Sequence, residues 1–227
     1  MQSAGSGSAC YSGSTSTTTT QTCQFASNTA GGNLYVIFAR WGSGTATASL
    51  SDTEGNSFSS TSGAVNIFTD GTSSQLFYAQ NVAGGTKDTI TVTISASVLR
   101  IELMIFEYSG VASSSALDAH KEVTQASSSS SCASASVTTS ANNDLIVGAC
   151  NLTNSPDSPT FTATSGFTLR LSGVREGEED RISAAGTYTS SMALSSSHHS
   201  ITHVAAFFAA AGGPAPKHPL PLLGVGL

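Results

Sequence analysis

Charged side chains are scarce in this chain: Asp, Glu, Lys and Arg together account for 10% of its 227 residues. Only eight residues are Lys or Arg, and the formal net charge is −6. Recognition of nucleic acid depends on clustered Lys and Arg, and so does binding to anionic membranes. We therefore expect no nucleic-acid partner and no electrostatic attachment to lipid.

Long apolar runs and the common metal or nucleophile motifs are also missing. No stretch approaches the roughly 18 apolar residues that a membrane-spanning helix needs, so we expect no membrane span. The sequence contains no C-x-x-C, no His/Cys zinc spacing and no G-x-S-x-G. These absences argue against a structural zinc site and against a hydrolase built on a nucleophile elbow.

Histidines gather near the C-terminal end of the chain as His198, His199 and His203. On a strand His199 and His203 share a face but lie roughly 13 Å apart, because each residue advances a strand by about 3.3 Å. The adjacent His198 and His199 point to opposite faces. We therefore expect polar or half-buried strand positions here, and no metal site.

Carboxylates offer two further candidates. The acidic run Glu176-Gly-Glu-Glu-Asp180 is predicted to be a solvated loop, because it lacks the ligand spacing of a calcium loop. Glycoside hydrolysis needs two facing carboxylates, but Glu102 and Glu107 are five residues apart on one predicted strand and fall on opposite faces. We expect no catalytic residues, no cofactor and no enzyme activity.

Hydroxyl side chains are what the chain has in excess, with 41 serines and 28 threonines. They suit the solvent face of a sheet, and the branched threonine side chain favours an extended backbone. A surface of hydroxyls is polar but nearly uncharged, which is unusual for a cytoplasmic protein that needs charge for solubility. The composition indicates an extracellular or cell-surface β-protein that repels its neighbours only weakly.

Four cysteines fall into two local groups, Cys10 with Cys23 and Cys132 with Cys150. Four cysteines allow three disulfide connectivities, and the sequence alone cannot choose among them. The local pairing is favoured because each pair brackets a Ser/Thr-rich stretch that can turn back on itself. Disulfides in turn predict an oxidising compartment.

Short segments with strand-like patterns follow one another along most of the chain. Thr89–Ser95 alternates strictly, with Ile90, Val92 and Ile94 on one face. The predicted strands are Leu34–Trp41, Thr45–Asp52, Gln75–Gln80, Thr89–Ser95, Leu99–Ser109, Glu122–Ala126, Ser134–Thr138, Asp144–Cys150, Phe167–Val174, Arg181–Thr189 and Ser200–Ala209. No segment of ten or more residues has a convincing helical period, so the sequence predicts an all-β protein.

Composition divides the chain into three regions. Residues 1–22 are predicted to be a Ser/Thr/Gly-rich extended arm, residues 23–210 a β-sandwich domain, and residues 211–227 a Pro-rich tail. Within the middle region Asn33–Ala39 resembles Asn143–Ala149, which indicates a weak internal duplication. The two similar halves are either two sheets of one sandwich or two small domains, and the absence of a clear linker favours one domain.

Four short motifs occur in a set order: Asp52-Thr-Glu-Gly-Asn56, Phe77-Tyr-Ala-Gln-Asn81, Glu107-Tyr-Ser-Gly-Val111 and Leu117-Asp118. In this order they resemble the jelly-roll-type β-sandwich modules of secreted, often repetitive, bacterial surface proteins. The resemblance covers about residues 24–210. It implies an antiparallel two-sheet sandwich of jelly-roll type in an extracellular setting, and some jelly-roll modules bind sugars.

These observations predict a non-catalytic extracellular structural module that self-associates into a fibre or coat, as a homo-oligomer or polymer. Its three lysines leave the edges of the sheets thinly protected. The alternative is a carbohydrate-binding module with a polysaccharide partner. Trp41, which ends a predicted strand beside Gly42, is the best candidate for a glycan contact, although packing in the core is the favoured role of this residue.

Overall fold

The computed structural model describes residues 9–67, 71–153, 157–212 and 216, and the described residues contain β-strands and no helix. The strands are β1 (Ala9–Gly13), β2 (Thr17–Gln24), β3 (Leu34–Gly42), β4 (Ala48–Asp52), β5 (Ser59–Ser60), β6 (Val65–Ile67), β7 (Thr72–Ala79), β8 (Thr89–Tyr108), β9 (Leu117–Ala133), β10 (Val137–Thr139), β11 (Asp144–Leu152), β12 (Phe161–Thr162), β13 (Thr168–Ser172), β14 (Glu176–Ser183), β15 (Gly186–Tyr188) and β16 (Ser191–Phe207). All strand pairs are antiparallel.

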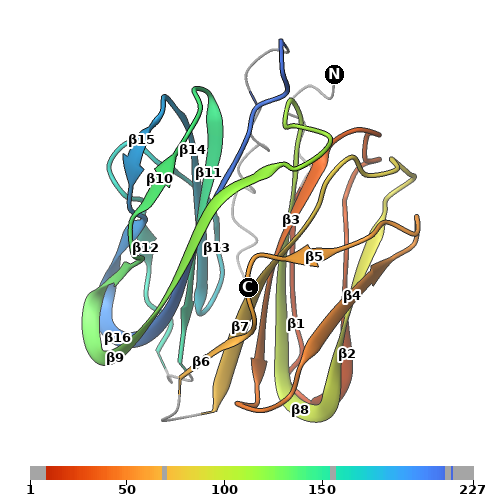
Figure 1. The fold of residues 1–227 in the computed structure, drawn as a ribbon. Helices are drawn as coiled ribbons and strands as arrows, with labels where there is room; N and C mark the ends of the chain where they lie inside the picture. Colours follow the sequence, from red (N-terminus) through yellow and green to blue (C-terminus); the bar gives the residue numbers. More distant parts are fainter. Residues whose placement is uncertain (1–8, 68–70, 154–156, 213–215, 217–227) are drawn as a thin grey trace.

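The N-terminal half of the molecule (β1–β8) is organised around its longest strand, β8. The first part of β8 pairs with β2 and β4, and its second part pairs with β1 and β3. Strand β7 follows on the far side of β3, with β5 and β6 beyond it. Between the two parts the β3–β8 register skips Arg100, whose φ of 66° marks a local distortion of the strand. One hydrogen-bonded sheet therefore folds into two facing layers (Figure 1).

The C-terminal half (β9–β16) repeats this plan with β16 in the place of β8. The first part of β16 pairs with β12 and the end of β9, and its second part pairs with β11 and the start of β9. Strand β11 lies between β16 and β14, just as β3 lies between β8 and β7. The single long β9 thus takes the place that β1 and β2 share in the first half.

The internal duplication that the sequence predicts is visible in this strand order, but the sequence match is one residue out of register. Matching Asn33 to Asn143 aligns Leu34 with Asp144. In the structure Leu34 and Leu145 are the residues that both face the other half, in a shared apolar cluster. Because side chains alternate between the two faces of a strand, a one-residue offset exchanges the buried faces.

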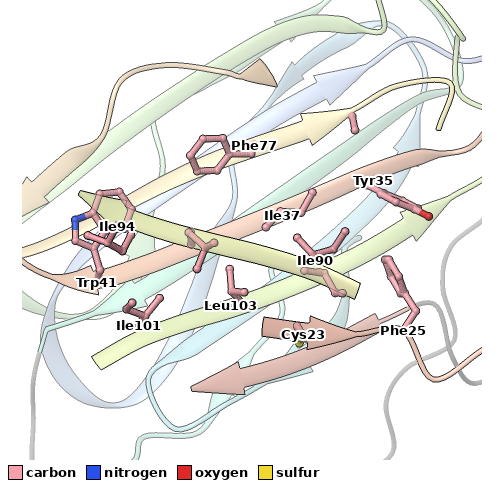
Figure 2. Close-up of a cluster of buried hydrophobic side chains, with 14 of the residues drawn as sticks. Cys23, Phe25, Tyr35, Ile37, Trp41, Phe77, Ile90, Ile94, Ile101 and Leu103 are labelled. Atoms are coloured by element: carbon pink, nitrogen blue, oxygen red, sulfur yellow. The ribbon is translucent and has the colours of Figure 1, made fainter. Parts of the chain in front are cut away.

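Apolar clusters lie between the layers. The first cluster fills the N-terminal half, where Ile90 and Ile94 of β8 meet Ile37 and Trp41 of β3 (Figure 2). The second contains residues of both halves, and we call this contact region between β1–β3–β7–β8 and β11–β13–β14–β16 the seam. Two smaller clusters lie in the C-terminal half, on the face of its sheet that points away from the seam. Figure 1 shows the two halves side by side, with β2 and β4 on the outside of the first.

The prediction of an all-β antiparallel sandwich is confirmed. Two local predictions are wrong. Residues 9–22, expected as an arm, form β1 and most of β2, because they pair with β8 through backbone hydrogen bonds and are pinned by Cys10 and Cys23. The acidic run 176–180, expected as a solvated loop, begins β14 and is buried. The predicted tail, apart from 211, 212 and 216, lies outside the described residues.

Candidate functional site

Both disulfides join the cysteines that were predicted to pair, Cys10 with Cys23 and Cys132 with Cys150. Cys10 lies on β1 and Cys23 on β2, whereas Cys132 lies on β9 and Cys150 on β11. In each half the bond therefore ties the outer layer to the inner sheet. Two disulfides indicate an oxidising compartment.

Trp41 is wholly enclosed in the core of the N-terminal half, with 0% of its surface exposed. Its indole Nε1–H donates to the Ala46 carbonyl oxygen at 3.0 Å, which satisfies the ring's one polar group. Figure 2 draws it among the apolar side chains of β3 and β8. The suggestion of a glycan contact at Trp41 is therefore wrong, because the ring has no free face to offer a sugar, and its favoured role in packing holds.

Two of the three histidines have separate side-chain partners, whereas His199 Nδ1 has no hydrogen-bond partner among the described residues. His198 Nε2 contacts Ser196 Oγ at 2.9 Å and Asp157 Oδ2 at 3.2 Å. His203 lies in the seam, where its Nε2 is 3.0 Å from Ser74 Oγ. Within the described ranges no group of three or more His, Cys, Asp or Glu side chains is arranged to hold a metal ion.

The Ser74–His203 contact resembles part of a hydrolytic triad but lacks its other features. Asn151 Nδ2 donates to Ser74 Oγ at 2.9 Å, so the serine hydroxyl proton is available to His203 Nε2. Burial lowers the pKa of His203 to about 4, which keeps the ring neutral. Among the described groups nothing bonds His203 Nδ1, so no carboxylate orients the ring, and both side chains are enclosed. We interpret the pair as an internal hydrogen bond of the seam.

A flat array of hydroxyls covers the outer layer of the N-terminal half. Every second side chain of β2, β4 and the first part of β8 points away from the core, and each of these is Thr, Ser or Gln. Cross-strand pairing aligns Thr20 with Thr93 and Thr93 with Ser49. The next outward residues form a second row, in which Thr91 pairs with Thr22 on one side and with Ser51 on the other. We call Thr20, Thr22, Ser49, Ser51, Thr89, Thr91 and Thr93 the hydroxyl face. The face carries no charged side chain.

Both strands that flank the hydroxyl face have an open edge. In the described part of the chain, β2 pairs with β8 alone, and so does β4. The outer backbone N–H and C=O groups of each strand therefore lack a strand partner. Strand β2 contains no charged residue and no proline, the two residue classes that most often protect an edge.

The interior shows the opposite pattern, because carboxyl groups collect there. Of the fourteen acidic residues in the chain, eight are buried. They are Asp88, Glu102, Glu107, Asp144, Glu176, Glu178, Glu179 and Asp180. Half of this set belongs to β14, where Glu176, Glu178 and Asp180 alternate along the face that meets the N-terminal half. We call these three side chains the carboxyl ladder.

Two arginines neutralise part of the ladder. Arg40 of β3 forms an ion pair with Glu102 of β8 and lies 3.8 Å, Nη1 to Oε1, from Glu176. Arg170 Nε of β13 lies 2.8 Å from Asp180 Oδ1. Tyr108 Oη donates to Glu178 Oε1 at 2.9 Å. Glu102 and Glu107 do fall on opposite faces, but Glu102 meets a second carboxyl, Glu176, from the other half.

Burial and neighbouring charge push the pKa values of these carboxyls apart. Burial, reinforced by the negative charge of Glu102, raises the pKa of Glu176 to about 8. Burial and the charge of Asp180 raise the pKa of Glu178 well above its ordinary value. Burial would also raise the pKa of Glu102, but the charge and hydrogen bond of Arg40 outweigh it and lower that pKa. These opposite shifts favour the neutral acid at Glu176 and the carboxylate at Glu102.

The exposed surface offers little else for recognition. Leu99, with 52% of its surface exposed, is the one large hydrophobic residue that stands out among the described residues. No aromatic ring in the same set is classed as exposed. No helix in the described ranges is long and apolar enough to cross a membrane.

Comparison with known proteins gives no relative: no family model matches the chain, and no curated protein matches it either.

Sequence reasoning missed the ladder, although one signal for it was present. Glu176, Glu178 and Asp180 are spaced at i, i+2 and i+4, the period of a strand face. Their charge argued for solvent, since acidic residues are almost never fully buried without partners. Two of the partners, Arg40 and Tyr108, come from the other half of the chain, so no local pattern could reveal them.

Proposed function

We propose that this protein is a non-catalytic structural module of an extracellular surface, which self-associates into a fibre or coat. The observation that carries the proposal is the hydroxyl face with an open strand edge on either side. Proteins that remain monomeric usually protect such edges with lysine, proline or inward-pointing charge. Here β2 itself carries no charge that would repel a second copy.

The disulfides support a role outside the cell, in an assembly that bears mechanical load. Each bond anchors an outer layer to the sheet beneath it, so an outer strand that pairs with a neighbour cannot be peeled away from its own half. Oxidising surroundings are where such bonds persist. We include in this proposal an extracellular location and a jelly-roll-type arrangement of residues 24–210.

The carbohydrate-binding alternative loses its best residue with the burial of Trp41. Sugar recognition by stacking needs a flat aromatic ring at the surface, and the described residues present none that is classed as exposed. A glycan would have to be held by the hydroxyl face through hydrogen bonds alone. Self-association is therefore the function that the geometry supports best.

Charge placed on the hydroxyl face tests the proposal. The double variant Thr20→Lys/Thr22→Lys puts two like charges on β2, and the same charges on every copy repel each other at short range. We expect wild-type protein to form large particles in light scattering and fibres or sheets in electron microscopy. The double variant is expected to elute as a monomer at the same concentration.

The matched control is Ser113→Lys/Ser114→Lys, which adds the same charge to an exposed loop between β8 and β9. This control should assemble like the wild type. A wild-type protein that stays monomeric at every concentration would refute the proposal, and equal assembly of both lysine variants would show that the hydroxyl face is not the contact.

A further inference from the structure

We propose that the seam is an alkali-sensitive lock, in which protonated carboxyls of the ladder keep the two halves together and their ionisation releases them. The proposal concerns the interior of one molecule, so it stands or falls independently of self-association.

The placement of β14 creates the lock. Its alternate residues Glu176, Glu178 and Asp180 face the N-terminal half, and none has more than 1% of its surface exposed. Around them the seam is apolar, with Leu34, Phe106 and other side chains of the second cluster. A charge in such surroundings costs several kcal/mol unless a counter-charge or hydrogen bonds compensate it.

Within the described residues, titratable groups from both halves meet the ladder. The first half contributes Arg40 from β3, Glu102 and Tyr108 from β8, and Tyr11 from β1. The second half contributes Arg170 from β13 and Arg175, which directly precedes β14. The side chain of Glu179 points to the other side of the sheet. Arg175 is half-buried; burial and the charges of Arg100 and Arg40 lower its pKa, while the charges of Glu102 and Glu176 act in the opposite direction.

Four carboxyls thus face two fully buried cations. Arg40 is committed to Glu102, and Arg170 is committed to Asp180. Glu176 reaches Arg40 only at 3.8 Å, and Glu178 forms no ion pair with an arginine within the described residues. Within the described structure Glu176 Oε1 and Glu178 Oε2 also lack a hydrogen-bond partner. A buried carboxyl with an unbonded oxygen is more stable as the neutral acid.

The direction of the pH effect follows from this placement. The pKa of Glu176, 4.5 when exposed, is raised to about 8 in the folded protein, and that of Glu178 moves the same way. The folded state therefore binds protons that the unfolded state has released. The contribution of Glu176 to stability is complete below about pH 4.5, declines as the pH rises, and is lost once the pH passes about 8. The contribution of Glu178 declines in the same direction.

Unfolding by urea at fixed protein concentration, from pH 5 to pH 9, tests the lock. The unfolding equilibrium constant of the wild type is expected to rise by up to about tenfold per pH unit for each carboxyl that ionises on unfolding. Glu176→Gln keeps the shape of the side chain and removes one such group, so its profile should be flatter. Glu54→Gln, at an exposed acid, is the matched control and should keep the wild-type slope.

Hydrogen exchange and infrared spectroscopy locate the effect in the wild-type protein itself. At pH 9 exchange corrected for intrinsic rates should accelerate in β3, β11 and β14, and the carboxylic-acid C=O band present at pH 6 should disappear. If Glu176→Gln does not fold, Glu178→Gln and these two measurements still decide. A wild-type stability independent of pH, or the absence of that band at pH 6, would overturn the proposal.

Discussion

Trp41 shows at the scale of one residue how enclosure decides what a side chain does. All of its surface is buried, and its single N–H is bonded within its own half. A glycan site needs an exposed aromatic ring, whereas the core of a folded sheet needs a buried one. A single ring cannot serve both purposes. The structure assigns Trp41 to the core.

Replacement of this residue should therefore affect stability. Trp41→Ala leaves a cavity between β3 and β8, and we expect a loss of about 3–5 kcal/mol in the free energy of unfolding. Urea titration followed by far-UV circular dichroism measures it. Leu99→Ala, at an exposed position, should change the same quantity by no more than about 0.5 kcal/mol. A small effect at Trp41 would contradict the packing of this core.

Individual strands were predictable where side chains alone determine them. Thr89–Ser95 was placed on a strand with Ile90, Val92 and Ile94 inward, and these three side chains do lie in the first apolar cluster. The start of the chain was missed because β1 and β2 bury few side chains and depend on backbone pairing with β8. The acidic strand β14 was missed because Arg40 and Tyr108, the partners of Glu176 and Glu178, are distant in sequence.

At the scale of the element, the disulfides hold outer strands that have little else to hold them. Strand β2 buries little beyond Cys23, so the Cys10–Cys23 bond closes a loop that would otherwise open readily. We expect Cys10→Ser/Cys23→Ser to cost about 3 kcal/mol, since the bond spans 13 residues, and removal of Cys132–Cys150 to cost a similar amount.

Chemical denaturation of the two double-serine variants against the wild type gives these values. Peptide mapping without reduction should first recover Cys10 linked to Cys23 and Cys132 linked to Cys150. Crossed links would contradict the strand order described above, and a loss in stability below about 1 kcal/mol would mean that the unfolded chain is already restrained there.

At the scale of the whole molecule, the seam makes the two halves interdependent. Phe207 of β16 packs against Tyr78 of β7, with ring centroids 5.5 Å apart, and the surrounding cluster draws on both halves. Neither half could expose this surface to water without losing a large part of its apolar burial. Most strands of each half are recoverable from the sequence, but their order in the sheets and the way the halves face each other are not.

This arrangement predicts a single unfolding transition near pH 5. Phe207→Ala should lower the free energy of unfolding by about 3–5 kcal/mol and shift the whole transition. Calorimetry tests this, because the calorimetric and van't Hoff enthalpies agree only for one cooperative unit. Two separate transitions, of which the variant moves only one, would show that the halves unfold independently.

The burial of eight carboxyls gives the chain different charge in its two states. While unfolded it exposes all fourteen acids to water, and newly made copies repel one another. Once folded, it holds several of those acids as neutral groups or ion pairs and presents hydroxyls instead. If copies self-associate as proposed, the folded chain meets its neighbours with less of this repulsion than the unfolded chain does.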